Sequence, residues 1–96
     1  MMVLVTYDVS TADDAGKTRL RHVAKHCVNY GQRVQNSVFE CILDPAQFTV
    51  FKAKLESLID AKRDSVRYYM LGAKWNNRVQ HVGARPTLDM SGPLIL

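Results

Sequence analysis

The first residues alternate between apolar and polar side chains in a way that is typical of a half-buried β-strand. In an extended chain every second residue shares a face. One face then carries Val3, Val5 and Tyr7, and the other carries Leu4, Thr6 and Asp8. The pattern predicts a strand over Met2–Val9 that places a carboxylate, Asp8, at its end.

A helical periodicity follows and predicts a helix over Asp14–Tyr30. Its apolar stripe has the spacing i, i+3, i+4, i+7 and i+8, and consists of Leu20, Val23, Ala24, Cys27 and Val28. Residues 10–14 (STADD) are typical of a helix N-terminus. This is the first interpretation of Asp13 and Asp14, with metal binding as the alternative. Gly31 is expected to end the helix in a left-handed conformation.

A second strand is predicted over Arg33–Leu43. Neither of its faces is cleanly apolar, so we expect it to have contacts on both sides. Asp44 and Pro45 are an N-cap and a first helical residue, and they predict a second helix that ends near Ala61. The apolar stripe of this helix consists of Phe48, Phe51, Leu55, Leu58 and Ile59.

Two further strands are predicted over Ser65–Leu71 and Arg78–Val82, and the apolar tail Pro93–Leu96 is a candidate extra strand. We interpret the arrangement as β-α-β-β-α-β, which is the ferredoxin-like α+β sandwich with a C-terminal addition. Both helices then cover one face of an antiparallel sheet. The bare face could bind RNA, a small ligand or a second subunit.

Length, composition and charge narrow the possible domain organisation and partners only moderately. A chain of 96 residues is expected to form a single domain over 1–96. The net charge of +4 favours an anionic partner, most commonly nucleic acid. The sequence has neither an apolar run of transmembrane length nor a signal peptide, so we expect no membrane partner and a cytoplasmic protein. Cys27 and Cys41 are expected to be buried thiols.

Asp8 is the first candidate for catalysis or metal binding, because the chain carries no other recognisable catalytic motif. The alternative is a turn residue that hydrogen-bonds the backbone of Ser10 and Thr11. One carboxylate alone is a poor magnesium site. A homodimer whose two-fold axis passes nearby would bring two copies of Asp8 together. Such a site would suit phosphodiester hydrolysis. His22 and His26 lack a third ligand nearby and are expected to be solvated.

Basic side chains lie close to Asp8 in the predicted fold. Lys17, Arg21 and Lys25 are spaced by four along one helix face. They form either a solvated face or a surface that binds phosphate groups. Arg19 lies beside them, and Arg33 lies at the start of the second predicted strand.

Several segments carry a resemblance to a known family. Residues 5–9 (VTYDV), the basic helix that ends at Tyr30 and Gly31, and residues 33–40 (RVQNSVFE) resemble the second of the numbered CRISPR-associated (Cas) proteins. The segment from Gln80 to Leu96 resembles the C-terminal end of the I-C subtype.

The resemblance implies a small ferredoxin-like homodimer, packed through its sheets, that works beside the CRISPR integrase in spacer acquisition. Asp8 matches the family's metal-binding aspartate, shared across the dimer, which implies Mg²⁺ or alternatively Mn²⁺. Tyr7, Arg33 and Phe39 match further site residues, although Phe39 could equally serve core or dimer packing. Basic positions of the family's first helix match Arg19 and Arg21. The resemblance thereby implies that Arg19, Arg21 and Arg33 bind nucleic acid, and for Arg33 it favours contact with a phosphate group over a solvated charge at the strand start.

The resemblance leaves more than one function open. Activities in the family are metal-dependent cleavage of single-stranded RNA or double-stranded DNA, and the first hypothesis is therefore a magnesium-dependent endonuclease. The second hypothesis is a DNA-binding scaffold of the integrase complex without turnover. A toxin-like endoribonuclease on the same fold is a third, weaker interpretation.

Overall fold

The order of helices and strands agrees with the ferredoxin-like prediction. The computed structural model describes residues 1–74 together with residues 80 and 82. The elements in chain order are β1 (Met2–Asp8), α1 (Asp14–Val28), β2 (Gly31–Gln35), β3 (Val38–Ile42), α2 (Pro45–Leu58) and β4 (Ser65–Gly72). This α+β arrangement is β-α-β-β-α-β, which is the expected ferredoxin-like order, although the individually predicted segments had one strand between the helices and two after the second helix.

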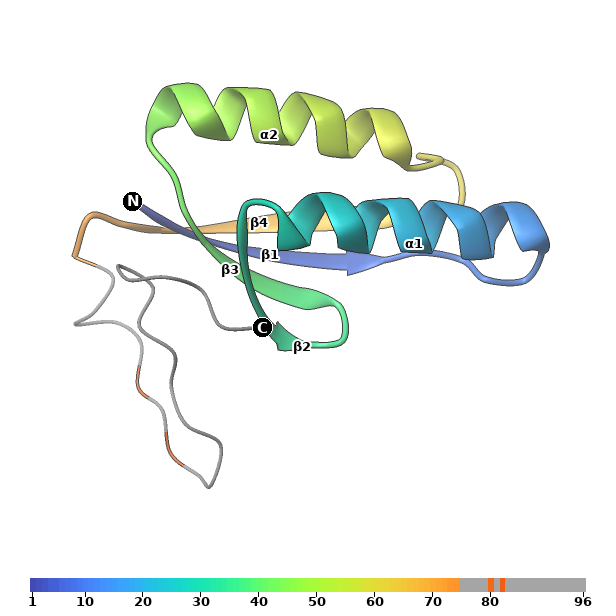
Figure 1. Cartoon of the computed structure of the whole chain (residues 1–96), viewed down its shortest axis with the longest axis horizontal. Coiled ribbons are helices and arrows are strands. Elements are labelled where there is room, and N and C mark those ends of the chain that lie inside the picture. Colours follow the sequence, from blue (N-terminus) through green and yellow to red (C-terminus); the bar gives the residue numbers. More distant parts are fainter. Residues whose placement is uncertain (75–79, 81, 83–96) are drawn as a thin grey trace.

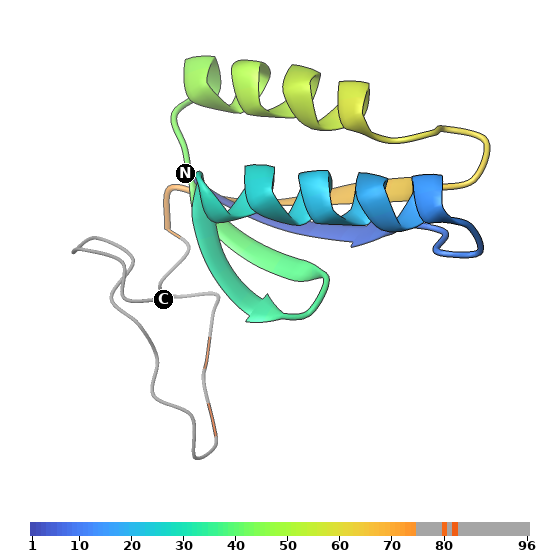
Figure 2. The ribbon, with the colours of Figure 1, turned by 45° about the vertical axis from the view of Figure 1, so that its right-hand side comes forward.

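The four strands form one antiparallel sheet in the order β2-β3-β1-β4. Figures 1 and 2 show α1 and α2 side by side on the same face of this sheet. The opposite face carries no helix from the described residues. β1 is a central strand, so the alternation of its side chains decides what each face of the sheet presents.

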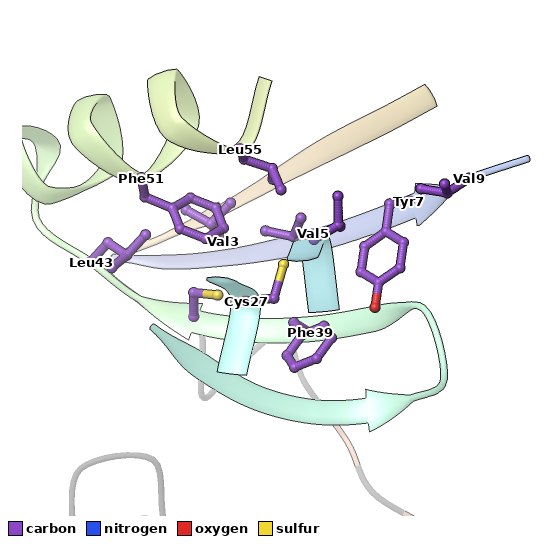
Figure 3. Close-up of a cluster of buried hydrophobic side chains, with 11 residues drawn as sticks. Val3, Val5, Tyr7, Val9, Cys27, Phe39, Leu43, Phe51 and Leu55 are labelled. Atoms are coloured by element: carbon purple, nitrogen blue, oxygen red, sulfur yellow. The ribbon is translucent and has the colours of Figure 1, made fainter. Parts of the chain in front are cut away.

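Side chains that point from the sheet toward the helices form the core (Figure 3). From β1 these are Val3, Val5 and Tyr7, all at most 5% exposed. The predicted helix stripes supply the other side: Val23 and Cys27 from α1, and Phe51 and Leu55 from α2, all fully buried. The remaining stripe residues are partly buried against this cluster. Burial of this apolar surface is the main force that stabilises the fold.

Both helices begin where capping chemistry predicts. Asp13 is the N-cap of α1, and its carboxylate accepts a hydrogen bond of 2.8 Å from the backbone N–H of Gly16. Asp44 forms a reciprocal capping box with Gln47 at the start of α2, and Pro45 occupies the first turn. The helices end earlier than expected, at Val28 and Leu58.

The prediction of one long strand over Arg33–Leu43 is wrong, because the chain reverses in its middle. Asn36 and Ser37 form a two-residue turn between β2 and β3. The backbone N–H and the hydroxyl of Tyr7 donate to the carbonyl groups of Ser37 and Asn36, at 3.1 and 3.2 Å. The reversal explains why neither face of the segment alternated cleanly.

Gly31 is not the predicted left-handed cap. It is the first residue of β2, and the only positive φ among the described residues belongs to Gly72. A Cβ atom at Gly31 would collide with Sγ of Cys41 and the carbonyl oxygen of Glu40. A glycine is therefore needed here for the close approach of β2 to β3, rather than for its dihedral freedom.

Some expectations fall on residues outside the described part of the chain. They are the strand over Arg78–Val82, of which only residues 80 and 82 are described, and the candidate strand Pro93–Leu96. Within the described residues, no helix has the length and apolarity needed to cross a membrane.

Candidate functional site

Asp8 lies at the end of β1 on the sheet face that the helices leave uncovered. Its exposure follows from the alternation of side chains along β1, in which Tyr7 is buried and Asp8 is exposed. The backbone N–H of Ser10 donates to Asp64 at 3.0 Å, so it is not the partner of Asp8 that the turn-residue interpretation required. Asp8 forms no hydrogen bond or ion pair with any residue that the structure describes. Its carboxylate is therefore available to a ligand.

A pocket of about 300 Å³ surrounds this carboxylate, and its lining residues are Thr6, Tyr7, Asp8, Ser65, Arg67 and Tyr69. Strand register explains the lining. Asp8 pairs with Ser65, and Thr6 pairs with Arg67, across the antiparallel β1–β4 ladder. Directly opposed residues point to the same face, so both strands supply polar groups to the face of Asp8.

A buried ionic contact fixes the chain on either side of this pocket. The carboxylate of Asp64 accepts hydrogen bonds from the backbone N–H groups of Ser10 and Asp60, at 3.0 and 2.9 Å. It also accepts two from the guanidinium of Arg19, at 2.8 and 3.4 Å. Burial of Asp64 acts to raise the pKa of its carboxyl group, but the bonds from Arg19 and the two backbone groups outweigh it, so the pKa lies below its ordinary value.

This contact ties together the two loops that flank the pocket. Ser10 lies two residues after Asp8, and Asp64 directly precedes Ser65, the strand partner of Asp8. The N-terminus of α1 presses on the same loop, because a Cβ atom at Gly16 would collide with the carbonyl oxygen of Ser10. The end of β1 is thus held in place before any ligand arrives.

The other predicted site residues of the sheet lie on the opposite, helix-covered face. The rings of Tyr7 and Phe39 stack with centroids 6.2 Å apart, and the guanidinium carbon of Arg33 lies 5.1 Å from the centroid of Phe39. Phe39 is fully buried, which agrees with the packing alternative for this residue. Burial also raises the pKa of Tyr7. The structure therefore groups these three residues with each other on the face opposite to Asp8, although Tyr7 also contributes to the lining of the Asp8 pocket.

The predicted nucleic-acid-binding residues of α1 have different surroundings. Arg19 is held by Asp64, and its side chain is only 18% exposed. Lys17, Arg21 and Lys25 are exposed. Lys25 lines a groove of about 280 Å³ together with His22, His26, Asn29, Lys54 and Leu58. The basic stripe thus lies in the helix layer, away from the uncovered sheet face (Figure 1).

The donors at the end of β1 fit a hard cation only in part. Carboxylate and hydroxyl oxygens are ligands that Mg²⁺ accepts, with water completing the octahedron, and Asp8, Thr6 and Ser65 offer such atoms. However, the described residues contain no group of three or more His, Cys, Asp or Glu side chains that could hold a metal ion. Among the residues that line the pocket in the described part of the chain, Asp8 supplies the one carboxylate.

Sequence reasoning missed two residues next to Asp8. Asp64 received no role in the sequence analysis, and nothing local in the sequence indicates its contact with Arg19. Arg67 was assigned to a strand without a role. Here a signal exists: Ser65, Arg67 and Tyr69 alternate with Val66 and Tyr68, which predicts a polar face next to that of Asp8.

The sequence matches one protein family over most of its length. The family model described as CRISPR associated protein Cas2 matches residues 1–79. A relative from Rhodospirillum rubrum, named CRISPR-associated endoribonuclease Cas2 3, is 61% identical over 99% of this chain and 100% of its own length. A relative from Halalkalibacterium halodurans, named CRISPR-associated endonuclease Cas2, is 57% identical over 99% of both chains.

Solved structures agree in fold. The crystal structure of Streptococcus pyogenes Cas2 at pH 6.5 is 61% identical, with a TM-score of 0.75 over 86% of this chain and 100% of that chain. A hypothetical protein from Thermus thermophilus is 32% identical, with a TM-score of 0.70 over 90% of this chain and 94% of that one.

Proposed function

The chain belongs to the CRISPR-associated Cas2 family, and from this premise we propose that it is a magnesium-dependent endonuclease. In this proposal it hydrolyses phosphodiester bonds of single-stranded RNA, double-stranded DNA or both, and it acts in spacer acquisition beside the CRISPR integrase. The names of its relatives, endoribonuclease and endonuclease, support the nuclease class. The protein is expected to work in the cytoplasm.

The observation that carries the proposal is the position of Asp8. It is an exposed carboxylate at a strand end, without a partner in the described residues, in a pocket that also contains hydroxyl groups and an arginine. A carboxylate that served only the fold would be expected to use its oxygens within the chain. Asp64 shows that pattern, and Asp8 does not.

In the proposed site Asp8 from each of two chains holds Mg²⁺, with Mn²⁺ as an alternative. A homodimer related by a two-fold axis would bring a second copy of Asp8 to the site, where the described lining of one chain offers a single carboxylate. The ion, when bound, would polarise a phosphate oxygen and lower the pKa of a coordinated water. The chain's own task is to keep Asp8 in place, and the hydrogen bond that the backbone N–H of Ser10 donates to Asp64 serves this.

Replacement of Asp8 by Asn tests the proposal. Asp8→Asn removes the charge that attracts the cation and keeps the side-chain shape. We expect wild type to cleave labelled RNA or DNA with Mg²⁺ or Mn²⁺, and the variant to lose both cleavage and Mn²⁺ binding while it still binds nucleic acid. The matched control is Asp14→Asn, since Asp14 is a fully exposed carboxylate on α1 and should keep full activity.

The second candidate function is a DNA-binding scaffold in the integrase complex. The absence of a multi-residue metal cluster from the described residues favours it, as does the exposed basic stripe of α1. If purified wild type cleaves neither RNA nor DNA with either metal over a range of pH, the scaffold is the better description.

A further inference from the structure

We propose that Arg67 binds a phosphate group of the nucleic acid in the Asp8 pocket, the role for which the sequence nominated Arg19 and Arg33. The inference rests on the proposed function, because it assumes that Asp8 marks the place where the substrate backbone lies. Arg67 is then the positively charged side chain that holds this backbone.

Strand register places Arg67 at the site. Thr6 faces Arg67 and Asp8 faces Ser65 in the β1–β4 ladder, so Arg67 is the diagonal neighbour of Asp8 on the same face. Diagonal neighbours of this kind are roughly 7–8 Å apart at Cα. Both side chains line the same pocket of about 300 Å³.

Two of the other nominated arginines are engaged elsewhere, and the third, Arg21, is exposed on α1 and does not line the Asp8 pocket. The guanidinium of Arg19 donates to the buried carboxylate of Asp64 at 2.8 Å. Arg33 lies over the ring of Phe39 on the helix-covered face. Arg67 lies on the uncovered face, is exposed, and forms no ion pair with a described residue. Among the residues that line the Asp8 pocket it supplies the positive charge.

The local chemistry suits a phosphate. A guanidinium presents a planar fork of donors that matches two phosphate oxygens. The interaction with Tyr69 raises the pKa of Arg67, so the guanidinium stays charged. The carboxylate of Asp8 alone would repel a phosphodiester. The positive charge of Arg67 beside it offsets that repulsion.

The first experiment measures binding without metal. Full-length wild type, Arg67→Gln and Lys62→Gln are titrated in EDTA with a labelled single-stranded RNA and a DNA duplex over a range of salt concentrations. Lys62→Gln is the matched control, because it removes one exposed positive charge from the loop before β4, outside the pocket. We expect Arg67→Gln to lower the salt slope by about 0.7 for the RNA or 0.9 for the duplex. Lys62→Gln should leave the slope unchanged.

The second experiment measures cleavage with Mn²⁺. Loss of a charged hydrogen bond to the substrate should lower kcat/KM roughly tenfold or more in Arg67→Gln, while Mn²⁺ affinity stays at the wild-type value. Arg67→Lys should keep the salt slope and recover only part of kcat/KM, because an ammonium group binds phosphate as a point charge. Size-exclusion chromatography should show the wild-type oligomeric state for each variant.

Three results overturn the inference: a wild-type salt slope in Arg67→Gln, an equal fall in Lys62→Gln, or wild-type cleavage by Arg67→Gln. A changed oligomeric state with unchanged binding also overturns it, since Arg67 would then serve assembly. If wild type does not cleave at all, the proposed nuclease function fails, and the binding experiment still decides the role of Arg67.

Discussion

The guanidinium of Arg19 lies 2.8 Å from the carboxylate of Asp64, although 45 positions separate the two residues in the chain. The side chain of Asp64 is completely buried. Through Ser10 the contact joins the first helix to the loops on both sides of the Asp8 pocket. An arginine that resembles a nucleic-acid-binding residue thus has a structural partner in this chain.

Replacement of Asp64 by Ala should destabilise the protein. The backbone N–H groups of Ser10 and Asp60 would lose their acceptor, and one unsatisfied buried donor costs roughly 1–3 kcal/mol. We expect the Tm to fall by roughly 5 °C or more, measured by thermal unfolding in circular dichroism. Asp60→Ala, which removes a half-buried carboxylate of the same loop, should have a smaller effect. Equal Tm values for Asp64→Ala and wild type would contradict this role.

Stability should fall in acid, because the pKa of Asp64 is lowered in the folded state. A depressed carboxyl pKa contributes stability above the unfolded pKa of about 4, and this contribution is lost as pH falls through the folded pKa. The Tm of wild type should therefore drop below about pH 4. Asp64→Asn, already destabilised at neutral pH, should drop less steeply. The pKa values of Asp13 and Glu56 are also lowered, so some acid dependence should persist.

Gly16→Ala should destabilise α1, against the usual trend. Alanine favours a helix interior over glycine by roughly 0.5–1 kcal/mol. Here the new Cβ atom would collide with the backbone oxygen of Ser10, so the helix or the loop must shift. We expect a lower denaturant midpoint for Gly16→Ala and a near-wild-type midpoint for Lys17→Ala, at the exposed neighbouring position. A higher midpoint for Gly16→Ala would show that the loop yields without cost.

Cys27 and Cys41 should resist alkylation in the folded protein. Both thiols are fully buried, and burial raises the pKa of each to about 12. The thiolate is the reactive form, so a thiol reagent near pH 8 should react slowly with the native chain. In denaturant both thiols should react rapidly with the reagent. Rapid reaction of one thiol under native conditions would show that the core opens locally.

Local patterns were enough to predict most of the layered fold. The alternation of Val3, Val5 and Tyr7, the capping residues Asp13 and Asp44, and the helix stripes all depend on short-range geometry. The β2–β3 hairpin was missed because its turn, Asn36–Ser37, lacks the glycine that usually marks a two-residue connection.

The site was harder to predict, since its residues come together only through long-range pairing. Asp8 was nominated from a strand end, and the structure agrees that it is exposed on the bare face. The pairing of Arg19 with Asp64 depends on how two loops meet, and no local pattern encodes it. The separation of Arg33 and Phe39 from Asp8 follows from the hairpin, whose register puts both on the helix side.

Because side chains alternate along β1, the face on which Asp8 lies depends on whether an odd or an even number of residues precedes it in the strand. A deletion or insertion of one residue between Val3 and Tyr7 would exchange the two faces of the strand. Asp8 would then point into the core and Tyr7 into solvent. Length changes in this strand should therefore survive selection only in steps of two, whereas single substitutions at Leu4 or Thr6 leave the position of the carboxylate intact.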